Sequence, residues 1–212
     1  MAGRLSGAER RESILRSAMG LFARRGFAGA ATRELAAASG ISEAMLFKHF
    51  PDKDALYRAI LSRKIEQAEA VMPLRELAAS EDPPEAFFGR IATNILERIE
   101  DDPSFLKLLL FSALEGHPLA GAFDRARAAG VRAVIGDYIR RNARRARLRP
   151  VDPAFASRAF LGMVGWFALA RVVFEEPGSL RIPRGRLVRD IVSLYLDGLR
   201  AQGRAVEKVA GR

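Results

Sequence analysis

The sequence predicts an all-helical fold with about nine helices. Apolar residues recur every three or four positions along nearly the whole chain, and almost nothing alternates with a period of two. Alanine, leucine and arginine, which all favour helices, are abundant. The 212 residues are 49% hydrophobic and 28% charged, which is typical of a globular chain with a sizeable core and excludes a disordered or collagen-like one.

The first half of the chain predicts one long helix, two short ones and a second long one. The first helix begins after Ser6, which forms a capping-box pattern with Glu9, and ends at Gly26, a residue favoured at helix C-termini. Its buried face comprises Ile14, Leu15, Ala18, Leu21 and Phe22. Two short helices follow over residues 32–39 and 42–50, and a longer one restarts after Pro51 and Asp52.

An aspartate followed by a proline marks helix starts in the second half. The pairs are Asp82-Pro83, Asp102-Pro103 and Asp152-Pro153, where the aspartate suits the N-cap and the proline suits the first turn. Helices are therefore expected to begin near residues 83, 103 and 153, with others after Pro118 and Pro183. Residues 106–114 are apolar nearly all round, which predicts a central position in a bundle.

Charge and composition narrow the function classes. The net charge of +10 and the pI of about 10.9 favour a polyanionic partner. No cysteine is present, which excludes disulfides, thiolate metal sites and cysteine nucleophiles. With only two histidines, and with Glu115 and His117 too sparse for a metal site, we expect no metal and no cofactor. No nucleophile–base pair or phosphate loop stands out, so we expect no enzyme.

No targeting segment is predicted. The first residues lack an apolar signal region. The longest apolar stretch, residues 159–170, is shorter than the ~20 residues that span a bilayer, so we interpret it as a buried core helix. We therefore expect a cytoplasmic protein with no membrane partner.

Residues 32–50, TRELAAASGISEAMLFKHF, predict two helices joined by a tight turn. Thr32 and Ser42 are suited to cap the two helices, and Gly40 suits a left-handed turn between them. Leu35, Ala36, Leu46 and Phe50 are expected to face the core, and Ile41 the corner between the helices. Glu43, Ala44, Phe47 and Lys48 then point outward, with Met45 and His49 at the margin. On spacing alone, an ordinary helical hairpin remains the alternative.

Residues 8–60 resemble the DNA-binding region of the TetR (tetracycline repressor) family of bacterial regulators. The resemblance rests on LFARRGF at the end of the first helix, on TRELAAASGIS and on LFKHFPDK. Residues 147–174, RLRPVDPAFASRAFLGMVGWFALARVVF, resemble the family's dimerisation region. The resemblance implies a three-helix helix-turn-helix domain over residues 1–54 and a larger helical domain for ligand binding and dimerisation over residues 55–212.

The resemblance also implies where DNA binds, with the second short helix in the major groove. Thr32, Phe47 and Lys53 are expected at phosphates, although Phe47 replaces the more usual tyrosine and lacks its hydroxyl. The candidates for base edges are Arg33, Glu43, Ala44, Met45, Lys48 and His49. With Ser42 as the cap of the reading helix, these ten residues form the expected DNA-binding set.

The carboxyl-terminal helices predict a dimer interface. The last helix carries two apolar stripes, and Gly162 and Gly165 lie three apart in an apolar helix, where glycine is unfavourable unless helices approach closely. A local kink or cavity is the alternative. Reading two half-sites also needs two heads about 34 Å apart. We predict a four-helix interface between homodimer subunits, from helices near 153–176 and 184–201, that includes Gly162, Gly165, Leu187, Ile191 and Leu194.

The resemblance further implies a small-molecule effector. Candidate lining residues of an apolar pocket are Phe88, Ile91, Ile95, Leu109, Phe111, Phe123, Trp166 and Phe167, each of which is equally suited to the core. The arginine cluster of residues 140–149 is interpreted as a solvated helix end, since positive charge is favoured there, with a second DNA patch as the alternative.

The predicted function is therefore that of a sequence-specific regulator, a repressor released from a palindromic operator by an apolar or aromatic ligand. Two alternatives stay open: a nonspecific DNA-binding protein, and a small-molecule carrier or enzyme that uses an apolar helical cavity.

Overall fold

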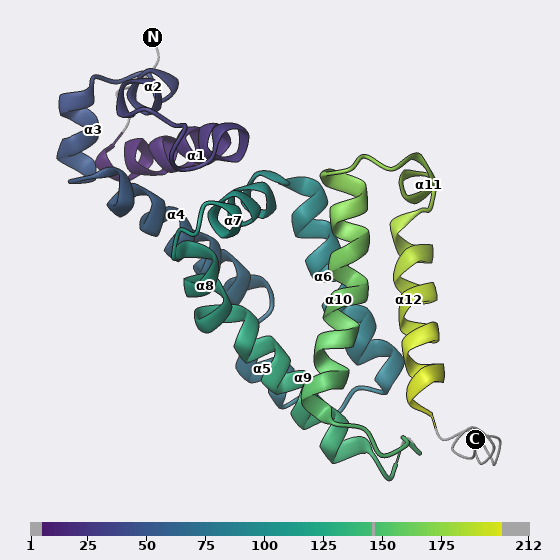
Figure 1. Ribbon diagram of the computed structural model, residues 1–212. Helices are drawn as coiled ribbons and strands as arrows, with labels where there is room; N and C mark the ends of the chain where they lie inside the picture. Colours follow the sequence, from purple (N-terminus) through teal and green to yellow (C-terminus); the bar gives the residue numbers. More distant parts are fainter. Residues whose placement is uncertain (1–5, 146, 201–212) are drawn as a thin grey trace. The chain divides into compact units, whose positions relative to one another are not determined.

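The computed structural model describes residues 6–145 and 147–200, and within these ranges every regular element is a helix (Figure 1). The all-helical prediction is therefore confirmed. The described residues form two compact units: unit 1 holds residues 6–73 and 101–129, and unit 2 holds residues 74–100 and 130–200. The functional boundary expected between residues 54 and 55 stays a prediction.

Unit 1 is built around the first helix. Its elements are α1 (Gly7–Arg25), α2 (Thr32–Ala38), α3 (Glu43–His49), α4 (Lys53–Val71), α7 (Ser104–Leu114), α8 (Leu119–Phe123) and the π-helical turn η1 (Asp124–Ala128). The predicted capping box is present at the start of α1, where Ser6 Oγ accepts from the Glu9 N–H at 3.2 Å and the Glu9 carboxylate accepts from the Ser6 N–H at 2.8 Å. The helix ends at Gly26, as predicted.

The core of unit 1 joins the predicted face of α1 to α4. All five apolar residues predicted for that face are buried. The ring of Phe22 meets the ring of Tyr57 edge-on, with 4.7 Å between centroids. The Tyr57 hydroxyl donates to the carbonyl of Leu108 at 3.3 Å, which ties α4 to α7.

α7 does not occupy the central position that its apolar sequence predicts. Only Leu108 and Ser112 are buried, and Leu114 is 85% exposed. The helix packs one face on α1 and leaves the other side partly open. Apolar composition alone therefore overstated its burial, because a helix needs neighbours on every side to be central.

Unit 2 comprises most of the carboxyl-terminal half. Its elements are α5 (Leu74–Ala78), α6 (Pro84–Asp101), α9 (Ala129–Asn142), α10 (Pro153–Val172), α11 (Pro177–Leu180) and α12 (Arg184–Leu199). Phe88 lies at the centre of an aromatic core, with its ring centroid 4.8 Å from that of Phe160 and 5.0 Å from that of Tyr195. The Tyr195 hydroxyl donates to the carbonyl of Ala156 at 2.9 Å and joins α12 to α10, which run side by side in Figure 1.

The predicted helix starts hold to within one residue. Asp152 caps α10 by accepting from the Ala154 N–H at 2.9 Å. At the other two Asp-Pro pairs the helices begin one residue later, at Pro84 and Ser104. In the described ranges nine helices have seven residues or more, α8 is the short start of the helix expected after Pro118, and α5 and α11 are short helices that the sequence did not predict.

α10 is half-buried, where the sequence predicted a buried core helix. One face packs in unit 2, while Phe155 and Trp166 on the opposite side are 65% and 58% exposed. By length and composition α10 alone among the described helices is apolar enough to cross a membrane, with 33% of the tested window buried. The exposed side of α10 carries large apolar side chains together with Arg158, and these apolar side chains are not covered by the chain itself.

Candidate nucleic-acid interface

The turn between α2 and α3 sets the direction of α3. Gly40 has a φ of +66°, the left-handed conformation that the sequence predicts there. Ser42 caps α3, since its Oγ accepts from the Met45 N–H at 3.2 Å. Leu46 and Phe50 are 3% and 2% exposed, so the inner side of α3 is anchored in unit 1. The Arg11 guanidinium lies over the Phe50 ring, 4.6 Å from its centroid.

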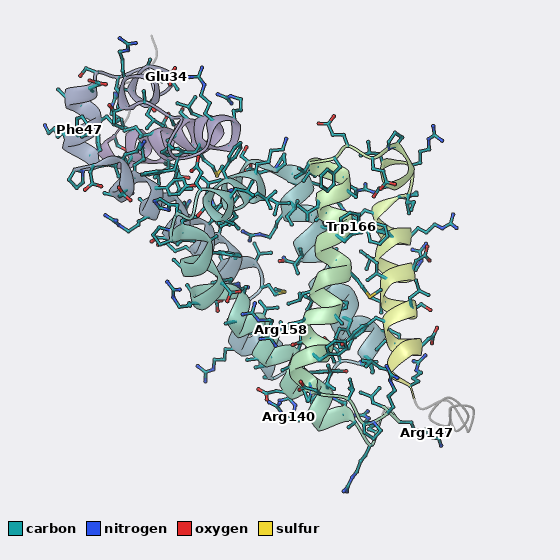
Figure 2. All side chains as sticks on the ribbon, in the orientation of Figure 1. Glu34, Phe47, Arg140, Arg147, Arg158 and Trp166 are labelled. Carbon is teal, nitrogen blue, oxygen red and sulfur yellow. The ribbon has the colours of Figure 1, made fainter. Side chains whose placement is uncertain are left out.

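The outer side of α3 presents the side chains that the sequence placed outward. Glu43, Ala44 and Lys48 are exposed, and Phe47 and Met45 are 43% and 38% exposed. His49 is half-buried at the margin. Figure 2 shows Phe47 projecting from the free side of α3. This helix therefore offers a charged, apolar and aromatic face to an external partner.

Thr32 is not the N-cap of α2, which corrects the prediction. Ala31 occupies the cap in extended conformation, and Thr32 is the first helical residue. The Glu34 carboxylate takes over the capping role by accepting from the Ala31 N–H at 3.3 Å. The Thr32 hydroxyl is thereby free to donate to Glu43 Oε1 at 3.1 Å, which links the starts of α2 and α3.

Glu34 is also paired with Arg25, at the end of α1. The hydrogen bond from Arg25, followed by the one from the Ala31 N–H, holds the pKa of the Glu34 carboxyl below its usual value. The carboxylate therefore stays charged at neutral pH and fixes the start of α2 against α1. Arg33, the next candidate for DNA, is exposed beside it.

Lys53 has a structural role in addition to any at DNA. Its ammonium donates to the carbonyls of Phe27 at 2.8 Å and Ala30 at 3.2 Å, and lies 4.3 Å from the centroid of the Phe27 ring. An ammonium has three N–H donors, so one remains for a further acceptor. Lys53 thus closes the loop between α1 and α2 from the first turn of α4.

Two residues that are distant in sequence, and that were not predicted, contact the loop between α1 and α2 and the start of α4. Glu115 accepts from the Phe27 N–H at 2.9 Å across 88 positions of sequence. His117 Nε2 lies 3.2 Å from Asp54 Oδ1, at the start of α4. Because these contacts are far apart in sequence, no local pattern predicts them.

Gly26 permits the Glu115 contact. Its φ is +72°, and a Cβ at this position would lie 2.1 Å from Glu115 Oε1. Neither Glu115 nor His117 joins a metal-binding cluster, since no group of three suitable side chains occurs among residues 6–145 and 147–200.

The structure revises the predicted dimer face. Leu187 and Ile191 are each 2% exposed and belong to the core of unit 2, so they are not available to a partner. The apolar residues of α12 are buried within the chain except Leu194, which is 68% exposed. Gly162 is exposed and Gly165 half-buried, and a Cβ on either would meet nothing within 4 Å. The chain's own packing therefore does not require these two glycines.

The predicted pocket residues are divided between the two units. Phe88 and Ile91 are buried in the aromatic core of unit 2, with Ile95 and Phe167 half-buried. Leu109, Phe111 and Phe123 are half-buried in unit 1, where Phe123 stacks edge-on with Phe105. Trp166 lies on the surface, 6.0 Å from the Phe174 ring, which revises its predicted place in an interior pocket.

Comparisons with known proteins match two segments of the chain to family models. Residues 14–60 match the family model of bacterial regulatory proteins of the tetR family, and residues 109–198 match the C-terminal domain of AefR-like transcriptional repressors. The HTH-type transcriptional repressor Rv1474c of Mycobacterium tuberculosis is 31% identical over 183 residues, which cover 82% of this chain and 88% of the relative.

Solved structures share the fold. AibR, determined with isovaleryl coenzyme A and operator DNA, has a TM-score of 0.69 at 22% identity and covers 88% of this chain and 97% of its own. FadR of Bacillus subtilis, determined with stearoyl-CoA, has a TM-score of 0.68 at 12% identity and covers 89% and 99%. Together with the capped, outward-facing α3, the two family-model matches and the relative from Mycobacterium tuberculosis show that the chain belongs to the TetR family of bacterial transcriptional regulators.

Proposed function

We propose that this chain is a sequence-specific repressor that places α3 in the major groove of operator DNA. The observation that carries the proposal is the division of α3 into an anchored side, with Leu46 and Phe50, and an exposed side, with Phe47 and Lys48. An anchored helix holds its outward side chains in fixed register with the bases. The net charge of +10 adds favourable attraction to the phosphates.

Individual roles follow from chemistry. Lys48 and Arg33 suit guanine O6 and N7, Glu43 suits cytosine N4, and Ala44 suits a thymine methyl group. Met45 and His49 flank this set at the margin of α3. At the phosphates, Thr32 turns its hydroxyl from Glu43 to a phosphate oxygen, Phe47 offers apolar contact with the sugar–phosphate wall, and Lys53 offers its remaining N–H.

We propose a homodimer whose subunits meet through α10 and α12. The exposed apolar side chains Phe155 and Trp166 of α10 and Leu194 of α12 are proposed to lie in this interface, beside the exposed Arg158, and Gly162 and Gly165 leave space for close approach. Leu187 and Ile191 are not part of this proposed interface, because both are buried in the core of unit 2. Two heads then read the two halves of a palindromic operator.

The effector proposed is a small molecule with an apolar part, which releases the operator because it binds one conformation of the dimer more tightly. Support comes from the two structural neighbours determined with acyl-CoA molecules. Titrating the operator complex with isovaleryl-CoA and stearoyl-CoA, with free coenzyme A as control, tests this class. We place the protein in the cytoplasm with the DNA.

The DNA proposal is tested by selecting duplexes from a random pool with the purified chain. We expect enrichment of an inverted repeat whose half-sites lie one helical turn, about 10 bp, or a multiple of it apart. Affinity for the selected duplex exceeds that for random DNA by about 10³-fold or more. Enrichment of no motif, with equal binding to all duplexes, overturns specificity and favours the nonspecific DNA-binding alternative that the charge of +10 permits.

A further inference from the structure

An open cavity lies in unit 2 where α9 ends and the chain turns toward α10. Its volume is about 480 Å³, which falls in the range of small-molecule sites. Ile139, Leu148 and Val151 give it an apolar wall. None of the residues predicted to line an effector pocket contributes to it, so it is separate from the effector proposal.

Four arginines complete the lining of this cavity: Arg140, Arg144, Arg147 and Arg149. Arg140 is paired with Asp137, one turn earlier on α9. The other three make no ion pair with any described residue. Figure 2 shows Arg140 near the end of α9 and Arg147 on the segment that follows.

The solvated helix end predicted from the sequence explains only part of this cluster. Positive charge within the last turn of a helix is favoured by the helix dipole, and Arg140 lies in that turn. Arg147 and Arg149 lie beyond the end of α9, so the dipole does not account for them. They also surround a cavity with an apolar wall, which a purely solvated surface does not need.

The segment that carries these arginines is fixed by backbone contacts. The Leu148 N–H donates to the carbonyl of Ala143 at 2.8 Å, and the Arg149 N–H donates to the carbonyl of Leu199 at 2.8 Å. Arg147 has a φ of +50°, an unfavourable conformation for a residue with a side chain. Such conformations persist where the surroundings enforce them, and they cluster at ligand sites.

We infer that this cavity binds a small amphipathic anion that carries a diphosphate or a similar pair of phosphate charges. Planar guanidinium groups match phosphate oxygens in a bidentate manner, and the apolar wall suits a hydrocarbon or ring attached to the phosphates. Acidic side chains around the cavity are already engaged: Asp137 is paired with Arg140, Asp152 caps α10, and Glu85 and Asp197 are paired with Arg200, whose backbone bridges to Leu148. A positive excess therefore remains at the cavity.

The test uses calorimetric titration of the full chain at 0.15 M salt with two probes, inorganic pyrophosphate and a five-carbon alkyl diphosphate. We expect both to bind, and the alkyl compound to bind at least fivefold more tightly because its hydrocarbon covers the apolar wall. Arg147→Gln and Arg149→Gln each weaken binding about tenfold or more. Arg145→Gln is the matched control, because it removes the same charge two positions from Arg147 but does not line the cavity.

Three results would overturn the inference. The first is no binding of either probe at millimolar concentration. The second is an equal loss with Arg145→Gln and Arg147→Gln, which indicates diffuse attraction without a site. The third is that Arg145→Gln and Arg147→Gln both bind random DNA duplexes more weakly and with a smaller salt dependence. That result indicates a second DNA-binding patch. Operator binding by Arg147→Gln, measured in parallel, stays unchanged, so the outcome is independent of the proposed DNA function.

Discussion

Phe47 is the aromatic residue on the exposed side of α3, at a position where the family more often has tyrosine. The residue is 43% exposed, and the buried residues Leu46 and Phe50 anchor the helix instead. A tyrosine would place a hydroxyl on the same free side without disturbing the anchored residues Leu46 and Phe50. A substitution at this position therefore measures how much one hydrogen bond to a phosphate contributes to DNA-binding affinity.

Phe47→Tyr is expected to tighten operator binding about tenfold or more, because the phosphate acceptor is charged. A hydrogen bond to a charged acceptor contributes roughly 1.5–3 kcal/mol in favourable cases and a neutral one about 0.5–1.5 kcal/mol. Fluorescence anisotropy with the selected duplex measures the change. Phe174→Tyr serves as control, since Phe174 is 62% exposed on unit 2 and is not expected at DNA. Unchanged or weaker binding at unchanged thermal stability would contradict the phosphate role of this position.

Asp102 provides a pH test at the residue scale. Burial alone would raise the pKa of its carboxyl, but the hydrogen bond and charge of Lys64, with hydrogen bonds from Ser104, outweigh burial and hold the pKa below its usual value. The Lys64 ammonium lies 2.7 Å from Asp102 Oδ2. A lowered carboxyl pKa stabilises the folded state above the unfolded value of 3.8, and this stabilisation is lost as the pH falls through the folded value.

Asp102→Asn is therefore expected to destabilise the protein near pH 6 by about 1 kcal/mol or less, because the pair is partly exposed to solvent. The difference from the parent shrinks as the pH falls below about 4. Urea unfolding at several pH values measures it. The exposed neighbour Asp101 supplies the control variant Asp101→Asn, with no expected effect. A difference that stays constant down to pH 3 would show that the ion pair does not stabilise the fold.

At the scale of elements, the turn before α3 depends on backbone conformation at Gly40. No atom lies within 4 Å of a Cβ built there, so a side chain meets no obstacle, and only the φ of +66° is unfavourable. Gly89, inside α6, likewise has nothing within 4 Å of its Cβ position but has an ordinary helical backbone. Because a side chain has no steric cost at either position, the pair isolates the conformational cost at Gly40.

Gly40→Ala is expected to lower the free energy of unfolding by about 1–2 kcal/mol, the cost of a left-handed residue with a side chain. Gly89→Ala is expected to raise it by about 0.4–1 kcal/mol, because alanine favours the helix and restricts the unfolded chain. Chemical denaturation of both variants provides the comparison. If Gly40→Ala were neutral, the turn would not need the left-handed conformation, and the account of how α3 is directed would fail.

Local signals in the sequence predicted the ends of helices well. Ser6, Ser42 and Asp152 cap helices as expected, because an N-cap is decided by a few adjacent residues. At Thr32 the same reasoning failed, since α2 begins one residue earlier: the Leu35 N–H donates to the Ala31 carbonyl, and Glu34 accepts from the Ala31 N–H. Competition between two possible caps in one turn is not visible in the sequence.

Burial was predicted less well than helix position. The sequence distinguishes an apolar face from a polar one but does not say which neighbour covers it. Leu187 and Ile191 pack in their own chain, while Leu194 on the same helix is exposed. For the candidate DNA face, the outward side of α3 was predicted, whereas the support from Glu115 depends on a contact across 88 positions.

At the scale of the whole molecule, a partner chain would cover the exposed apolar side chains of α10 and α12. Phe155, Trp166 and Leu194 are 65%, 58% and 68% exposed. A second copy of the chain would cover them and would supply the second DNA-reading head. Linking two heads raises operator affinity, because the second contact becomes intramolecular.

Leu194→Glu is expected to shift the chain from dimer to monomer and to weaken operator binding by about 10²-fold or more. The fold of each chain remains intact, because the side chain is largely exposed. Light scattering after size-exclusion chromatography reports the mass, and circular dichroism the fold. Leu114→Glu is the matched control, since Leu114 is 85% exposed on α7 and outside the proposed interface. A stable dimer of Leu194→Glu would place the interface elsewhere.

We propose above that the outward side of α3 reads a specific DNA sequence. The most direct measurement is fluorescence anisotropy of the purified chain with the DNA upstream of its own gene and with a scrambled duplex, at two salt concentrations. We expect tight binding of the native fragment alone, and a loss of about tenfold in Lys48→Ala, since one good base contact is worth about 1–3 kcal/mol. Lys107→Ala on α7 removes the same charge away from α3 and leaves binding unchanged. Equal binding of both duplexes with a steep salt dependence, unaffected by Lys48→Ala, would contradict sequence-specific reading by this helix.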